Sequence, residues 1–104
     1  MLEKDIERRL GERLVRMGCV YYKFVSPGQR GVPDRIVICP DGTLVFVELK
    51  RPGGRTATLQ SVQQARLRRR GQLVEEIWTV GDAARFVDWV ARLHCGPVKG
   101  GDDR

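Results

Sequence analysis

The spacing of hydrophobic positions changes along the chain, and each spacing predicts one type of element. The first segment repeats apolar residues at every fourth position, as on one face of a helix; they are Leu2, Ile6, Leu10 and Leu14, with Met17 three further on. Gly18 follows and is placed to end this helix. Residues 19–25 are rich in β-branched and aromatic side chains and predict the first strand.

Two apolar runs separated by a short turn predict a β-hairpin over residues 34–50. The runs cover residues 35–39 and 43–47, and Pro40-Asp41-Gly42 between them is typical of a turn that joins antiparallel strands. Both runs are apolar at nearly every position, which is usual for strands that are buried on both faces. We therefore expect helices on both sides of the sheet.

The second half of the chain predicts a helix, a strand and another helix. Thr56 or Thr58 is expected to cap the first of these helices, which ends at Gly71. Its predicted apolar face consists of Leu59, Val62 and Ala65, widened by Leu67. Residues 73–80 predict a fourth strand, although Glu75-Glu76 interrupts its pattern. A turn and N-cap at Gly81-Asp82 then precede an amphipathic helix with apolar residues Ala83, Phe86, Val87, Val90 and Leu93.

The predicted order is helix, three strands, helix, strand and helix. This is an α/β fold with an αβββαβ core, a mixed four-stranded sheet flanked by helices, and an additional C-terminal helix. A chain of 104 residues is expected to form one domain, which we place at residues 1–93. Residues 94–104 lack periodicity and are expected to form a flexible tail.

The composition indicates a basic protein of a reducing compartment. The formal net charge is +6, which suits a polyanionic partner but also a merely soluble basic surface. Cys19, Cys39 and Cys95 are odd in number and show no CxxC spacing, so we expect neither a disulfide framework nor a zinc site. No signal peptide or long apolar run is present, and we expect a cytoplasmic protein that is neither secreted nor membrane-bound.

Two carboxylates and a lysine are expected to meet at one end of the hairpin. Glu48 and Lys50 are two residues apart and share a face of their strand, and the hairpin can bring Asp34 beside them. Taking carboxylates out of water costs several kcal/mol each unless another group compensates. A divalent cation compensates well, because hard cations prefer oxygen ligands. The alternative is an ordinary ion pair at a strand end.

These residues form a known signature, Pro33-Asp34 followed by Glu48-Leu49-Lys50, which resembles the PD-(D/E)XK pattern of nucleases. The surrounding stretches make the resemblance more specific: RGVPDRIVI at 30–38, VFVELKRPGG at 45–54, and Leu59-Gln60. Together they resemble the VRR-NUC family, the virus-type replication-repair nucleases, over roughly residues 2 to 90. The chain looks like a minimal, standalone member, of the kind expected in a phage or a bacterium that carries one.

The resemblance implies a metal-dependent endodeoxyribonuclease. It implies one or two Mg²⁺ or Mn²⁺ ions on Asp34, Glu48 and the main-chain carbonyl of Leu49. Lys50 would orient a water molecule or stabilise the charge of the transition state, and we favour the second role. Gln60 is expected to support the site or contact substrate, with a helix-surface amide as the alternative. A glutamate of the first helix is implied near the metal.

That glutamate is expected to be Glu3 rather than Glu7. For Glu7 we favour a solvated acidic flank of the first helix, paired with a neighbouring Lys4 or Arg8.

The implied substrate is a branched DNA duplex of replication and repair, such as a four-way (Holliday) junction. Two cuts need two sites, so we expect a homodimer, with residues 86–93 as one candidate interface. The expected phosphate contacts are Arg30, Arg51, Arg55, Arg68 and Arg69. The alternatives are a loop-tip charge for Arg30 and helix capping for the arginines near Gly71.

Other functions have less support in the sequence. A non-catalytic DNA-binding module with a nuclease fold would use the same basic residues, but it would not need Asp34, Glu48 and Lys50 together. An RNA-directed nuclease is a weaker option, because no set pattern of stacking aromatics occurs. His94 is the only histidine, so a Ser-His-Asp arrangement lacks a base. No GxGxxG or Walker-type loop is present, and we expect no small-molecule cofactor.

Overall fold

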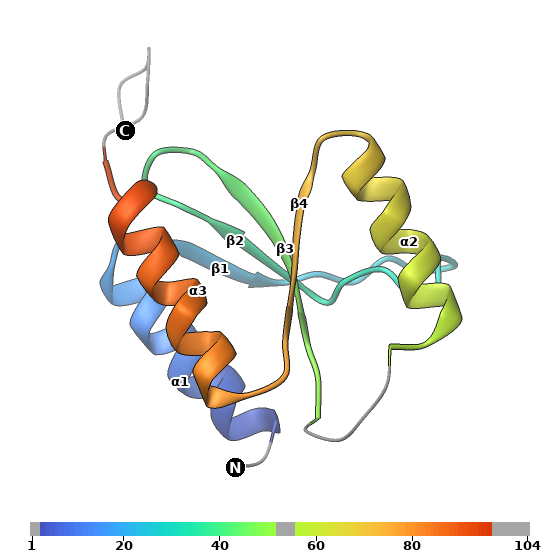
Figure 1. Cartoon of the computed structure of the whole chain (residues 1–104), viewed down its shortest axis with the longest axis horizontal. Coiled ribbons are helices and arrows are strands. Elements are labelled where there is room, and N and C mark those ends of the chain that lie inside the picture. Colours follow the sequence, from blue (N-terminus) through green and yellow to red (C-terminus); the bar gives the residue numbers. More distant parts are fainter. Residues whose placement is uncertain (1–2, 52–55, 97–104) are drawn as a thin grey trace.

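The chain folds into one four-stranded sheet with helices on both faces (Figure 1). The computed structural model describes residues 3–51 and 56–96. In chain order the elements are α1 Glu3–Arg16, β1 Val20–Lys23, β2 Arg35–Ile38, β3 Leu44–Leu49, α2 Thr58–Arg69, β4 Leu73–Ile77 and α3 Val80–Leu93. This order confirms the predicted αβββαβ core and the additional C-terminal helix.

The sheet is mixed, as predicted, and its strands follow the order β1-β2-β3-β4. β1, β2 and β3 form an antiparallel meander, whereas β4 pairs with β3 in parallel after the crossover through α2. The predicted turn between β2 and β3 is closed by the Cys39 amide, which donates to the Thr43 carbonyl over 2.8 Å. Gly42 takes a φ of 92° in this turn, a conformation that favours glycine.

α1 and α3 cover one face of the sheet and enclose the apolar core (Figure 1). The predicted stripe of α1 is buried here through Ile6, Leu10 and Leu14, and α3 adds Phe86, Val87 and Val90. Phe86, Val87 and Val90 thus face the core, whereas Asp88 and Leu93 of the same helix are exposed, and a dimer interface over residues 86–93 stays a prediction. Cys19 and Cys39 also lie in this core, and burial raises the pKa of the Cys39 thiol to about 12.

α2 lies on the other side of the sheet, next to β4, and its packing differs from the prediction (Figure 1). The expected inner face was apolar, but Leu59 is 51% exposed and Val62 is 47% exposed. Gln64 faces inward instead and is only 4% exposed. Polar contacts join the helix to the strand, because Gln64 donates to Glu76 over 3.1 Å and Arg68 donates to the Val74 carbonyl over 2.9 Å.

Both predicted helix starts in the second half of the chain need correction. Thr79, not Gly81-Asp82, is the N-cap of α3, and its hydroxyl accepts from the Asp82 amide over 3.0 Å. Asp82 returns the contact by accepting from the Thr79 amide, so the two residues form a capping box. α2 has Ala57 at its N-cap position, and the Thr56 hydroxyl donates to Glu76 instead of capping the helix.

His94 begins the segment expected to be a tail, but the structure holds it in place. Its Nδ1 lies 2.8 Å from an Asp41 carboxylate oxygen and 3.1 Å from the Thr43 hydroxyl, and its ring packs on Trp89. Residues 97–104 lie outside the described part of the chain. Among the described helices, none combines the length and apolar character that a membrane crossing requires.

Gly31, in the loop before β2, packs directly against the first turn of α2. Its φ is 84°, and a Cβ atom at this position would lie 2.6 Å from the main-chain carbon and oxygen of Leu59. Only glycine therefore allows the loop and the first turn of α2 to approach this closely. The contact fixes the position of the helix turn that carries Gln60.

We expect Gly31→Ala to destabilise the fold more than Gly28→Ala. Both glycines have positive φ, which costs an alanine roughly 1–2 kcal/mol. A Cβ at Gly28 meets no atom within 4 Å, whereas one at Gly31 collides with backbone. Urea unfolding of the two variants measures the difference, and equal losses would show that the close contact with α2 contributes nothing.

Candidate functional site

Asp34 and Glu48 are brought to the same end of the β2–β3 pair. The register pairs Arg35 with Val47, so one further step sets Asp34 across from Glu48. The ladder extends to Asp34 on its other side as well, because the Phe24 amide donates to the Asp34 carbonyl over 2.8 Å. Residues that face each other across antiparallel strands carry their side chains on the same face. The hairpin therefore sets Asp34 and Glu48 opposite each other, on the same face of the sheet.

The two carboxylate oxygens of Asp34 have different surroundings. Oδ2 lies 3.4 Å from the Arg35 guanidinium. Oδ1 is buried and has no hydrogen-bond partner among the described residues. A buried polar atom without a partner costs about 1–3 kcal/mol, so native structures rarely keep one without a reason. Asp34 thus presents one oriented, desolvated oxygen at the end of the sheet.

Glu48 and Lys50 are buried on the same face of β3, with exposed fractions of 7% and 8%. The Lys50 ammonium donates to the side-chain oxygen of Gln60 on α2, and the Ala57 amide donates to the same oxygen over 3.1 Å. The Lys50 amide also donates to the Ile77 carbonyl of β4 over 2.8 Å. Gln60 is therefore not a free helix-surface amide, because it holds the lysine in place.

Glu76 is a further carboxylate beside Glu48 and Lys50, and the sequence pattern gave no prediction for it. It pairs with Glu48 across the parallel β3–β4 ladder, so both side chains leave the sheet on the α2 side. Its Oε2 accepts from the Thr56 hydroxyl over 2.7 Å and from the Gln64 amide over 3.1 Å. Burial raises the pKa of Glu76, but these hydrogen bonds and the Lys50 and Arg68 charges outweigh it, so the pKa lies below its ordinary value.

Glu7 reaches the site from the opposite side of the sheet. Its carboxylate accepts from the Arg35 guanidinium, which also contacts Asp34, so the predicted pairing with Lys4 or Arg8 is wrong. The Arg8 side chain pairs with Glu12 instead, over 3.3 Å. Glu3 begins α1, but its side chain lies outside the described residues.

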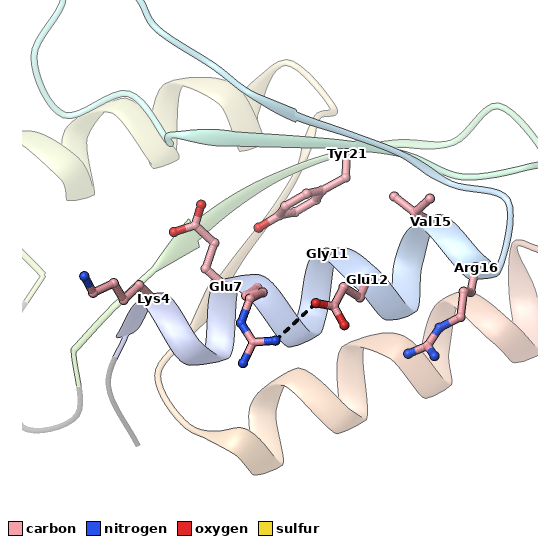
Figure 2. A pocket seen from close by; sticks show the side chains of 8 residues that line it. Lys4, Glu7, Gly11, Glu12, Val15, Arg16 and Tyr21 are labelled. Atoms are coloured by element: carbon pink, nitrogen blue, oxygen red, sulfur yellow. Dashed lines mark hydrogen bonds and ion pairs between the residues drawn. The ribbon is translucent and has the colours of Figure 1, made fainter.

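Tyr21 lies over Gly11 with its hydroxyl turned toward Glu7, and it borders a surface groove along α1 (Figure 2). The groove has a volume of about 710 Å³ and carries both charge signs, from Lys4, Arg8 and Arg16 and from Glu7 and Glu12. Burial raises the pKa of the Tyr21 hydroxyl to about 12, against the opposing effect of the nearby Arg35 charge. Of the residues that line the groove, Glu7 contacts the Arg35 guanidinium, which in turn contacts Asp34.

The arginines expected to contact phosphate divide into two groups. Arg30, Arg51 and Arg69 are exposed, and the Arg30 carbonyl is anchored by the Gln63 side chain over 3.3 Å. Arg68 also has exposed atoms, but its guanidinium is occupied by Gln64 and by the Val74 carbonyl. Arg70 contacts the Arg66 carbonyl, in agreement with the helix-capping alternative. Arg55 lies outside the described residues.

Comparison with known proteins identifies the family of this chain. No protein-family profile matches the chain. A solved structure named "VRR_NUC domain" superposes with a TM-score of 0.77 at 26% identity, over 83% of this chain and 94% of the other. The protein named "Putative nuclease p44" of Acyrthosiphon pisum secondary endosymbiont phage 1 is 48% identical over 65 residues, which are 62% of this chain and 70% of that protein. The chain belongs to the VRR-NUC family.

Membership in the VRR-NUC family makes the chain a nuclease by family and by fold, as the sequence motif predicted. Within the described residues, no three His, Cys, Asp or Glu side chains come close enough to hold a metal ion by themselves.

We expect Glu76→Gln to destabilise the fold at neutral pH by about 1 kcal/mol, a few degrees in melting temperature. Because the folded pKa of Glu76 is lowered, its contribution is present above the ordinary value of 4.5 and is lost as the pH falls through the folded pKa. Thermal melts of the wild type and Glu76→Gln, measured from roughly pH 3 to pH 8, should therefore give melting temperatures that converge at acid pH.

Glu75→Gln is the matched control, because it removes the same charge from the adjacent residue. Desolvation raises the pKa of Glu75, so its ionised form opposes folding. This variant should lose no stability at neutral pH. A parallel loss in both variants would show that the hydrogen bonds to Glu76 are not the cause.

Proposed function

We propose that this nuclease is a divalent-cation-dependent DNA endonuclease, with Mg²⁺ or Mn²⁺ on Asp34, Glu48 and the main-chain carbonyl of Leu49. One observation carries the proposal: Asp34 Oδ1 is buried without a hydrogen-bond partner among the described residues, at the strand end that also buries Glu48 and Lys50. A ligand that accepts electron density from this oxygen removes its desolvation penalty.

The donor set fits Mg²⁺ or Mn²⁺ better than other common metals. Carboxylate and carbonyl oxygens are hard ligands, whereas the buried Cys19 and Cys39 lie in the apolar core on the opposite face. Mg²⁺ is usually bound through one or two carboxylates, and substrate phosphate and water complete its octahedron. A site on Asp34 and Glu48 therefore suits a cation whose coordination a phosphodiester completes.

The chain's own groups prepare the site for phosphate hydrolysis. When bound, the cation would neutralise the phosphate and lower the pKa of a coordinated water. The contact with Gln60 fixes the position of the Lys50 ammonium group. A positive charge at this position would stabilise the negative charge that develops in the transition state. Because Gln60 belongs to α2, the position of the lysine depends on how α2 packs on the sheet.

The substrate we propose is branched duplex DNA, and the active form a homodimer. Arg30, Arg51 and Arg69 are exposed cations available to phosphates, whereas Arg68 has a structural role already. A single domain offers one site, and a twofold dimer would match the symmetry of a four-way junction. Sedimentation at micromolar concentration should give a dimer, and a monomer that cuts only one strand would contradict this part of the proposal.

We expect Asp34→Asn to reduce cleavage roughly a thousandfold or more while DNA binding persists, because the amide keeps the shape but loses the charge that holds a cation. Glu48→Gln and Lys50→Met should have comparable effects. Asp88→Asn is the control, since it makes the same change at an exposed α3 residue paired with Arg92.

The assay is a panel of labelled linear, flap, fork and four-way DNA with Mg²⁺ or Mn²⁺, and EDTA as the blank. Four-way or flap substrates should be cut faster than linear duplex. If the wild type and Asp34→Asn bind DNA equally and neither cleaves any substrate, the chain is a non-catalytic DNA-binding module.

A further inference from the structure

Arg35 carries a buried charge that the proposed chemistry does not use directly. Arg35 is the first residue of β2, but it is only 6% exposed, and its side chain faces α1 rather than solvent. A buried guanidinium costs several kcal/mol unless carboxylates and carbonyls satisfy it. Its contacts therefore indicate what the residue does.

Arg35 touches Asp34 twice. Its Nη1 donates to the Asp34 carbonyl over 2.9 Å and lies 3.4 Å from the Asp34 Oδ2 atom. These contacts turn Oδ2 toward the arginine and leave Oδ1 as the desolvated oxygen. The planar guanidinium is suited to this task, because one fork can hold a carbonyl and carboxylates in fixed geometry.

The same contact has an electrostatic disadvantage for cation binding. A full positive charge 3.4 Å from a metal-binding carboxylate repels a divalent cation at the same carboxylate. Glu7 offsets this charge, because its carboxylate accepts from the other terminal nitrogen of Arg35. Glu7 is the long-range partner, twenty-eight residues away in sequence, and it reaches Arg35 from α1.

We propose that Arg35 is the positioning residue for Asp34, and that Glu7 neutralises Arg35 so that Asp34 remains able to hold a cation. Glu7 thus acts through Arg35 and is not itself a ligand. This inference rests on the proposed function, since it requires that Asp34 binds Mg²⁺ or Mn²⁺.

The test is the Mn²⁺ affinity of the DNA-free protein, measured by isothermal titration on four variants. Glu7→Gln leaves Arg35 unbalanced and should weaken Mn²⁺ binding roughly tenfold. Glu7→Gln/Arg35→Met removes both charges, and methionine fills the volume of the stem. It should bind Mn²⁺ more tightly than Glu7→Gln alone, within about threefold of the wild type, because the repulsion is gone and only the orientation is lost.

Glu12→Gln is the matched control, because it removes the same charge from the same helix at an exposed residue paired with Arg8. Its Mn²⁺ affinity should equal that of the wild type. Metal-free thermal melts verify that every variant is folded at the titration temperature. The main comparison is between Glu7→Gln and Glu7→Gln/Arg35→Met. A single Arg35 variant is not used, because it would leave Glu7 without its partner.

Each outcome decides the inference. A double variant that binds Mn²⁺ no tighter than Glu7→Gln would overturn the proposal that Glu7 acts by neutralising Arg35, as would an unchanged affinity in Glu7→Gln. Asp34→Asn, the fourth variant, separates this failure from failure of the proposed function. If it binds Mn²⁺ as well as the wild type does, the cation site itself is wrong.

Discussion

The cost of burying charge at one end of the β2–β3 pair is the constraint on which the rest of the structure depends. Asp34, Arg35, Glu48 and Lys50 all lie within two residues of a strand terminus, and the last three are almost fully buried. An unpaired charge in such a position would be strongly destabilising. The helices therefore have to supply polar partners here, Glu7 from α1 and Gln60 from α2.

This requirement explains why the two faces of the sheet pack so differently. α1 and α3 bury aliphatic side chains and form the core that stabilises the domain. α2 instead meets the sheet through Gln60, Gln64 and Arg68, and leaves Leu59 and Val62 largely exposed. A polar junction of this kind contributes less to stability than apolar burial, but it fixes the direction of side chains. The packing of α2 thus serves the site more than the fold.

The sequence predicted the elements well, because periodicity and turn residues are local signals. The stripe of α1, the Pro40-Asp41-Gly42 turn and the place of Asp34 opposite Glu48 in the hairpin all follow from spacing. The orientation of α2 was predicted wrongly, because either its apolar or its polar face could pack on the sheet. The charged groups on the sheet favour the polar face, and they lie outside α2 in the sequence. Thr79 was overlooked as a cap, since Asp82 is an equally good capping residue three positions later.

The partners of the site residues were the least predictable feature. Arg35 and Glu76 are charged residues inside otherwise apolar strands, and that interruption was the one signal available. Their roles arise from contacts across twelve residues or more, such as Gln64 with Glu76 and Glu7 with Arg35. No local pattern encodes such contacts, whereas a buried charge in a strand always implies that a partner exists.

The most direct test of the account is anomalous diffraction from crystals grown with Mn²⁺. The account predicts a Mn²⁺ peak at Asp34 and Glu48, within a typical oxygen–metal distance of roughly 2.1 Å of their carboxylates. A peak bound elsewhere, with Asp34 Oδ1 still buried and unliganded at saturating Mn²⁺, would contradict it.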